Sequence, residues 1–428
     1  MSNTPRPLRF HFVFTVLFLF VCASVAVGQH EGGVTGGGTI GGSTSRPTSK
    51  PPATKPANKS TSTAPAVKKR PAATSAKPGA ASNPRVATTP SRPASAKPSA
   101  TSNSGVPVRM GLADSYYQQG EALYNAKKYR EALDSYLQAA QSNPSMTAAL
   151  YRIGWIYNDL EQYEDAVDPL KRAVSLQSNH AAAHFELGYA YKKLQRFNEA
   201  LAAFQLCVGA KPDYAAAHYE IGWIQNDHKN YNDAIKSLKL AMQYRASYAE
   251  AHNEMGYALR NLGRYPEAIQ EYQQAIRIKP EFGLAHLGLG DVYYYNTKQY
   301  AEAAQAYREG VRLKPDNATA FYNLGWCYND LERYADAIAE LRKAISLEPT
   351  YAEAYNEMGY ALHQLNRYPE AVLAYQSAIR QKTDYASAHY NLGVSFIALR
   401  NRNGALAQYR ILQRIDSTRA TKLFNQIK

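Results

Sequence analysis

The sequence predicts an all-α solenoid built from nine helix-turn-helix repeats, and two periodic residues carry this prediction. A glycine recurs every 34 residues, with one step of 35, at Gly120, Gly154, Gly188, Gly222, Gly256, Gly290, Gly325, Gly359 and Gly393. An alanine recurs at the same interval, at Ala132, Ala166, Ala200, Ala234, Ala268, Ala303, Ala337, Ala371 and Ala405. A fixed period of this length indicates one unit copied in tandem, in which each copy buries its apolar face against the next.

Residues 249–280 show why each unit is expected to hold two helices. The spacing i, i+3, i+4 and i+7 places His252, Met255, Gly256 and Leu259 on one face of a first helix. After a polar corner at 261–264 the same spacing defines a second helix, which Pro280 closes. Gly256 is expected where the two helices cross, because a larger side chain there would hold the backbones apart.

This pattern resembles the tetratricopeptide repeat, whose signature places Trp, Leu-Gly and Tyr on the first helix and Ala, Phe, Ala and Pro on the second. The resemblance covers nine copies over residues 112–416. It implies a right-handed superhelix whose first helices line a concave groove for an extended peptide or a helix of a partner protein. Residues 417–428 have Leu423, Phe424 and Ile427 on one side and are expected to form a capping helix on the last copy.

The segment before the repeats has a different composition. Residues 1–28 combine a basic start, an apolar run and small residues before Gln29, which indicates a signal peptide, with an uncleaved membrane anchor as the alternative. Residues 29–111 are rich in Pro, Ser, Thr, Ala and Lys and are predicted to be a disordered linker, because they cannot bury enough apolar area to offset their ordering entropy. We therefore expect an exported protein that is periplasmic, extracellular or membrane-tethered.

The positive charge of the chain lies mostly in this leading segment. The formal net charge is +14, and residues 1–108 contain 13 of the 49 Lys and Arg residues, with Glu31 as their single acid. The repeats are nearly neutral, so we expect no nucleic-acid-binding face on them. For the basic linker two hypotheses remain open: a solvated spacer, or contact with an anionic envelope surface.

A second row of side chains lies about a quarter turn from the apolar face of the first helices. Its rings and amides suit partner binding, since rigid aromatics give contact area at low entropy cost and amides can bind a peptide backbone. Packing between neighbouring first helices is the alternative. The tryptophans, each followed by Asn-Asp, are the strongest expected anchors. We call this row the aromatic stripe: Tyr151, Trp155, Asn158, Tyr189, Tyr219, Trp223, Asn226, Asn253, Tyr257, Tyr322, Trp326, Asn329, Asn356 and Tyr360.

Two further patterns bear on this stripe. Copies four to six and seven to nine look like a duplicated triplet, 103 residues apart, so the surface chemistry is expected to be duplicated as well. Acidic side chains beside the stripe favour a neutral to basic protein partner; they are Glu186, Glu220, Glu254 and Glu357. The competing hypotheses are a carbohydrate-binding module, whose rings stack on sugars of the cell envelope, and occupation by the chain's own basic linker.

The sequence offers no catalytic motif: no Gly-x-Ser-x-Gly, no phosphate loop and no His-Glu-x-x-His. We therefore expect that the protein is not an enzyme and that it binds no cofactor or metal ion. Recurrent histidines lie a whole repeat apart, too far to share one ion, and are expected to pack; they are His184, His218, His252, His286 and His389. Cys207 and Cys327 replace small residues and are expected to be buried. The extra residue of the sixth copy, beside Tyr293 to Tyr295, is expected between its two helices.

Overall fold

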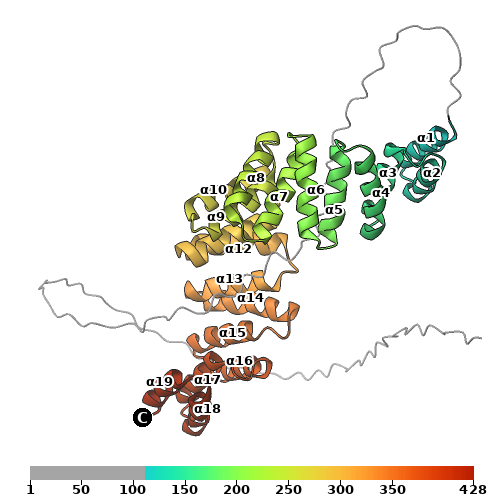
Figure 1. The fold of residues 1–428 in the computed structure, drawn as a ribbon. Coiled ribbons are helices and arrows are strands. Elements are labelled where there is room, and N and C mark those ends of the chain that lie inside the picture. The colour runs from blue at the N-terminus through green and yellow to red at the C-terminus, as the bar shows by residue number, and fades with distance from the viewer. Residues whose placement is uncertain (1–110) are drawn as a thin grey trace, which may run out of the picture. The chain divides into compact units, whose positions relative to one another are not determined.

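The computed structural model describes residues 111–428, and every regular element in that range is helical (Figure 1). The all-α repeat fold is therefore confirmed. The predicted leader and linker fall on residues 1–110 and lie outside the described residues. The helices of the described range fall short of the combined length and apolarity that a bilayer crossing requires.

The helices pair in chain order into nine hairpins. The first helices are α1 (Leu112–Asn125), α3 (Thr147–Asp159), α5 (Ala181–Lys193), α7 (Ala215–Asp227), α9 (Ala249–Asn261), α11 (Gly283–Asp291), α13 (Ala318–Asp330), α15 (Ala352–Gln364) and α17 (Ala386–Ala398). The second helices are α2 (Tyr129–Ser142), α4 (Tyr163–Leu176), α6 (Phe197–Ala210), α8 (Tyr231–Tyr244), α10 (Tyr265–Ile278), α12 (Tyr300–Leu313), α14 (Tyr334–Leu347), α16 (Tyr368–Gln381) and α18 (Arg402–Ile415). A last helix, α19 (Ser417–Ile427), packs on α17 and α18.

The recurrent glycine and alanine allow the close crossing inside each hairpin. The recurrent alanines are completely buried in all nine copies. A Cβ placed on Gly222 would lie only 2.7 Å from Leu238 Cγ and 3.2 Å from the Ala234 carbonyl oxygen. Because real Cβ atoms do not approach other atoms so closely, only glycine permits the two helices to meet at this distance.

The turn inside each hairpin repeats one backbone conformation. One residue of the turn has a positive φ, between 57° and 76°, and it is glycine in the fifth copy alone. In the first copy the N–H of Lys128 then donates to the Leu123 carbonyl at 2.9 Å, which closes the first helix in the manner of a Schellman motif. The nine residues are Lys127, Glu161, Gln195, Lys229, Gly263, Lys298, Glu332, Asn366 and Arg400.

The sixth copy accommodates its extra residue inside its first helix. Helix α11 continues into a π-helical segment, η1 (Val292–Thr297), and Lys298 then turns the chain as in the other copies. The prediction that the extra residue lies between the two helices was therefore wrong. A π-helical turn holds one more residue than an α-helical turn, so the added residue is taken up by the helix, and only residues 298–299 connect it to α12.

Candidate functional site

The aromatic stripe lies along the contact between successive first helices. Contacts join α3 with α5, α7 with α9, α9 with α11, α13 with α15, and α15 with α17. Half of the stripe is buried there: Asn158, Tyr219, Asn226, Tyr322, Trp326, Asn329 and Asn356. The other half keeps some exposure to solvent, which reaches 36% at Tyr360: Tyr151, Trp155, Tyr189, Trp223, Asn253, Tyr257 and Tyr360.

Three of the buried asparagines make the same bond between neighbouring copies. Each side-chain amide donates to both the backbone carbonyl and the carboxylate of a glutamate 28 residues later; the pairs are Asn158 with Glu186, Asn226 with Glu254, and Asn329 with Glu357. In the first pair the amide nitrogen lies 3.0 Å from the carbonyl oxygen and 2.9 Å from the carboxylate. These amides are thus committed to holding repeats together and are not open to a partner's backbone.

Sequence reasoning did not find this bond, although the signal was present. Each of the three copies that carry a tryptophan has an asparagine at the same repeat position, and a glutamate follows 28 residues later in the next copy. The spacing predicts peptide-binding asparagines, because it fixes their angular position on the helix but not their depth from the surface. Depth is set by the side chains of the next copy.

The asparagine pairs leave polar atoms buried. The carbonyl oxygens Oδ1 of Asn158, Asn226 and Asn329 are sealed from solvent and accept no hydrogen bond within the described part of the chain. Beside one of them, burial raises the pKa of the Glu254 carboxyl above its ordinary range, against the lowering effect of the bond from Asn226. The pair at Asn226 is therefore a polar contact in an environment that disfavours charge.

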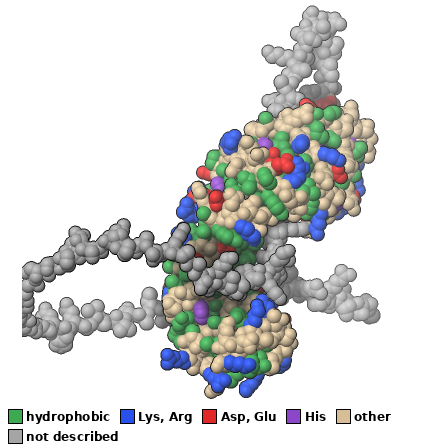
Figure 2. All heavy atoms as spheres, turned by 90° about the vertical axis from the view of Figure 1, so that its left-hand side faces the viewer, with side chains coloured by type: hydrophobic (Ala, Val, Ile, Leu, Met, Phe, Trp, Pro, Cys, Tyr) green, Lys and Arg blue, Asp and Glu red, His purple; other side chains and the backbone are tan. Residues whose placement is uncertain are grey.

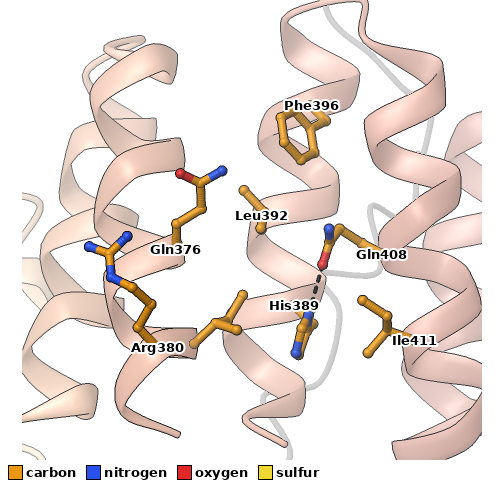
Figure 3. Close-up of a pocket in the computed structure, with 8 residues that line it drawn as sticks. Gln376, Arg380, His389, Leu392, Phe396, Gln408 and Ile411 are labelled. Carbon is orange, nitrogen blue, oxygen red and sulfur yellow. Dashed lines mark hydrogen bonds between the residues drawn. The ribbon is translucent and has the colours of Figure 1, made fainter. Parts of the chain in front are cut away.

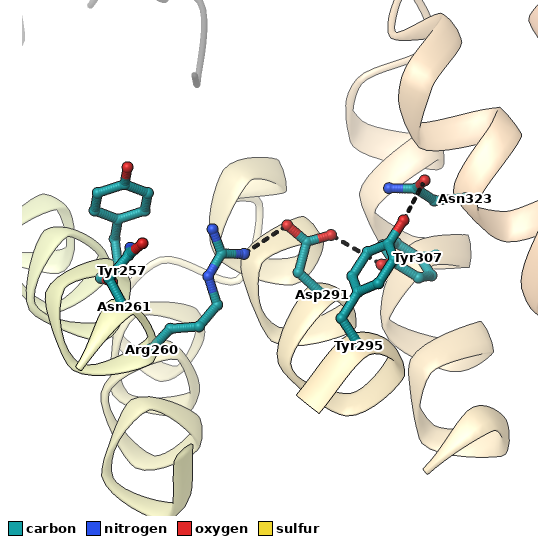
Figure 4. A network of polar contacts seen from close by, with 7 residues as sticks. All are labelled: Tyr257, Arg260, Asn261, Asp291, Tyr295, Tyr307 and Asn323. Atoms are coloured by element: carbon teal, nitrogen blue, oxygen red, sulfur yellow. Dashed lines mark hydrogen bonds and ion pairs between the residues drawn. The ribbon is translucent and has the colours of Figure 1, made fainter. Parts of the chain in front are cut away.

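Other copies build the same connection from different chemistry. Lys192 forms an ion pair with Glu220. In the sixth copy Gly288 stands where the third, fourth, fifth and eighth copies carry glutamate, and Arg260 instead pairs with Asp291, 2.6 Å away. Tyr307 also donates its hydroxyl to Asp291, at 2.8 Å, and Figure 4 shows how Asp291 lies between the two. The contacts that join successive first helices form what we call the polar ladder: Asn158–Glu186, Lys192–Glu220, Asn226–Glu254, Arg260–Asp291 and Asn329–Glu357.

The sixth copy extends the ladder through its π-helical segment. Tyr295 donates its hydroxyl to the side-chain oxygen of Asn323 on α13, at 3.1 Å (Figure 4). Tyr294, one residue earlier, donates to Asp330 on the same helix. The two tyrosines therefore tie η1 to the seventh copy by hydrogen bonds from adjacent residues.

The three tryptophans pack against the preceding copy, but their surroundings differ. The ring of Trp155 lies 5.3 Å from that of Tyr124, and the Arg152 guanidinium carbon lies 4.9 Å from the Trp155 ring centre. The ring of Trp223 lies 6.0 Å from that of Phe197, and the Lys192 ammonium lies 4.2 Å from the Trp223 ring centre. Both residues stay partly exposed.

Trp326 is enclosed more fully than the other two. Its ring lies 5.2 Å from Tyr294, 5.8 Å from Tyr295 and 5.7 Å from Tyr322, and 9% of the residue remains exposed. A partner cannot use it as an anchor in this conformation. For Trp326 the packing interpretation therefore describes the observed contacts, whereas Trp155 and Trp223 have ring surface to offer.

Four of the five recurrent histidines contact a carbonyl of the loop before their own helix, and the fifth, His252, instead lies 2.7 Å from Glu271 Oε2. His184 Nε2 lies 2.9 Å from the Ser178 carbonyl oxygen, and His218 Nε2 lies 2.8 Å from the Pro212 carbonyl oxygen. Such short contacts show a packing and hydrogen-bonding role. Within residues 111–428 no three His, Cys, Asp or Glu side chains gather in a way that could hold a metal ion.

An open pocket of about 360 Å³ lies between α16, α17 and α18, apart from the aromatic stripe (Figure 3). Its walls include Leu392, Phe396 and Ile411. At one side His389 Nδ1 lies 2.7 Å from the Gln408 side-chain oxygen, so these polar groups satisfy each other instead of pointing to a ligand.

Comparison with protein families identifies the repeat unit. Models described as TPR repeat match residues 256–296 and 359–399, and models described as tetratricopeptide repeat match residues 117–181, 181–214, 287–352 and 340–372. Together these matches span more than half of the chain. The chain belongs to the tetratricopeptide repeat family. Proteins with this repeat are generally scaffolds for protein–protein interactions and typically not enzymes.

Solved structures of other tetratricopeptide repeat proteins resemble the chain. YrrB, described as a TPR protein with an unusual peptide-binding site, is 24% identical, with a TM-score of 0.42 over 45% of this chain and 99% of its own. MamA is 22% identical, with a TM-score of 0.38 over 40% of this chain and 93% of its own. The C-terminal part of a TPR repeat-containing protein from Cytophaga hutchinsonii is 16% identical, with a TM-score of 0.46 over 56% and 99%. No curated protein matches the chain.

Proposed function

We propose that this tetratricopeptide repeat protein is a non-enzymatic scaffold that binds a segment of a partner protein through the exposed half of the aromatic stripe. The observation that carries the proposal is the row of partly exposed rings on four consecutive first helices, α3 to α9. The row consists of Tyr151, Trp155, Tyr189, Trp223 and Tyr257. Large rings that stay partly exposed while resting on a rigid array present apolar area already fixed in position, so little entropy is lost on binding.

The partner proposed for this row is a neutral to basic peptide segment or helix. The cations near the tryptophans are already engaged, since Arg152 pairs with Glu121 and Lys192 pairs with Glu220. The tryptophans therefore have little unpaired positive charge beside them to attract an acidic segment. Lys193, 5.5 Å from the Tyr189 ring centre, forms no ion pair within the described residues and is the exception along the row. Contact with the partner is expected to be mainly apolar and aromatic.

The proposed setting is an extracytoplasmic or envelope assembly. Its support is the leader-like composition of residues 1–28 and the basic composition of residues 29–111, which suits an anionic envelope surface. Mass spectrometry of the mature N-terminus tests the setting. A chain that starts at Met1 and fractionates with the cytoplasm would contradict it.

Two matched variants test the binding face. Peptides would be selected from a display library on the full-length protein, and their affinities measured with the wild type, Trp223→Ala and Trp326→Ala. Loss of a true anchor costs about 2 kcal/mol or more, roughly a thirtyfold rise in Kd. We expect Trp223→Ala to weaken binding with the helical circular dichroism retained.

Trp326→Ala serves as the control for packing. It should lower the melting temperature, because it removes a buried ring. If the selected peptides bind Trp223→Ala as tightly as the wild type, the aromatic stripe is not the binding face. If Trp223→Ala unfolds, its ring belongs to the packing of the repeats.

A further inference from the structure

The C-terminal end of the chain is strongly basic, in contrast to the nearly balanced repeats before it. Residues 399–428 contain one acidic side chain, Asp416. We call their basic side chains the basic cap: Arg400, Arg402, Arg410, Arg414, Arg419, Lys422 and Lys428. In Figure 2 the lower end, which α16 to α19 form in Figure 1, shows Lys and Arg side chains and no Asp or Glu on the visible face.

The basic cap lacks the ion pairs that neutralise basic residues in earlier copies. Four copies place an arginine directly before the second helix and pair it with a carboxylate three residues later: Arg196 with Glu199, Arg264 with Glu267, Arg333 with Asp336, and Arg367 with Glu370. In the last copy Asn401 takes the place of this arginine and accepts from the N–H of Gly404 at 2.9 Å. Glycine supplies no carboxylate there.

Most of the basic cap is therefore exposed and uncompensated. Arg419 pairs with Asp416. The remaining members are exposed, and within residues 111–428 no carboxylate forms an ion pair with Arg400, Arg402, Arg410, Arg414 or Lys422. Several like charges held on one rigid end raise the local positive potential and attract an anionic partner.

Two of the arginines border a small pocket. A recess of about 110 Å³ is lined by Ile397, Arg400, Arg402 and Ile427. Guanidinium groups bind carboxylates through paired hydrogen bonds, and the isoleucines offer apolar walls to the methylene groups of an acidic side chain. The recess has room for a single side chain, which fits an extended peptide better than a bulky polymer.

We propose that the basic cap binds an acidic segment of a partner protein, with one Asp or Glu side chain entering the recess between Arg400 and Arg402. This surface is separate from the aromatic stripe. It is proposed to bind an acidic segment, whereas the stripe is proposed to bind a neutral to basic one. A membrane surface is a poorer fit, because α19 turns its apolar residues inward. Leu423 and Ile427 are buried, and Phe424 stacks on Tyr409 at 4.9 Å.

The test uses the full-length chain and a ten-residue poly-glutamate peptide that carries a photo-activated cross-linker. Residues 1–108 are basic and will also attract this peptide, so mass spectrometry must locate the cross-links. We expect cross-links within 397–428 that disappear in Arg400→Gln/Arg402→Gln, while any cross-links within 1–108 persist. Affinity measured by fluorescence anisotropy should fall, with a roughly tenfold or greater rise in the Kd of the cap site.

Arg264→Gln/Arg333→Gln is the matched control, because it removes the same charge from equivalent turns where the arginines are paired. It should leave the cap cross-links unchanged. Three results would overturn the proposal. The first is that cross-links to residues 397–428 are absent, or persist in Arg400→Gln/Arg402→Gln. The second is that the protein floats with phosphatidylglycerol vesicles only when both arginines are present, although it does not capture the peptide. The third is that the protein self-associates in sedimentation only when both arginines are present, which would assign the surface to a second copy.

Discussion

Replacement of Glu254 by glutamine tests the physical reading of the polar ladder. Glu254 is half-buried, its carboxylate accepts from the Asn226 amide at 3.1 Å, and burial raises the pKa of the carboxyl above its ordinary range. Glutamine has the same shape and keeps an acceptor for that amide, but it removes the charge. It also brings an N–H₂ group close to Asn226, whose Oδ1 accepts no bond within the described residues.

The expected gain in the free energy of unfolding is roughly 1–3 kcal/mol at pH 7.5, the usual cost of a buried polar group whose needs are not met. The size of this gain depends on pH. Because the folded-state pKa of Glu254 lies above its unfolded value of about 4.3, folding takes up a proton, and wild-type stability falls as the pH rises through the folded-state pKa. The advantage of glutamine should therefore be full above that pKa and vanish below about pH 4.3.

Urea denaturation at pH 4 and pH 7.5, followed by circular dichroism, measures this difference. Glu281→Gln is the control, since Glu281 is exposed in the loop before α11 and its replacement should change stability little at either pH. The account of a carboxylate disfavoured by burial would be refuted if Glu254→Gln were less stable than the wild type at pH 7.5, or if its gain in stability did not change with pH.

Three further predictions concern packing, turns and acidity. Gly222→Ala should destabilise by about 1–3 kcal/mol, because its Cβ would meet Leu238, whereas Gly209→Ala should stabilise by about 0.5–1 kcal/mol, because nothing lies within 4 Å of its Cβ. Gly263→Ala should lower the free energy of unfolding by about 1 kcal/mol, because residue 263 has a positive φ. Lys229→Gly, at the equivalent position of another turn, should raise the melting temperature of the protein. Burial lowers the pKa of His363, so its stabilising contribution is present above about pH 6.5 and lost as the pH falls; His363→Gln should flatten the decline of the melting temperature between pH 7 and 5.

The fold was predictable because its determinants are local and repeated. A recurrent glycine and a recurrent alanine define the helix crossing, and the spacing of apolar residues defines both helices. The π-helical segment was not predictable in the same way. An added residue near three tyrosines fits a longer connection as well as a wider helical turn, and the choice between them depends on what the tyrosines contact in the next copy.

The candidate site was predictable in position but not in exposure. Helical spacing placed the aromatic stripe correctly on the first helices, because angular position follows from sequence number. Whether Asn226 faces solvent or a glutamate depends on the next first helix, 28 residues later. The same limit explains why Glu254, which the sequence places beside the stripe, contacts Asn226 within the polar ladder.

The tryptophan-bearing copies show how one residue can change a repeated surface. Trp155 and Trp326 both follow a copy with tyrosine at the same repeat position, Tyr124 and Tyr294, and the ring distances are similar, 5.3 Å and 5.2 Å. Yet Trp155 stays partly exposed and Trp326 does not. The difference is the second ring of Tyr295, supplied by the π-helical turn.

The fourth copy follows one that carries Lys192 at this position, so Trp223 meets a single flexible cation there instead of two rings. The two triplets therefore share their sequence pattern without sharing their accessible surface. Copies two and four carry the tryptophans that stay partly exposed, and the insertion in the sixth copy makes the equivalent residue of the seventh copy a packing residue.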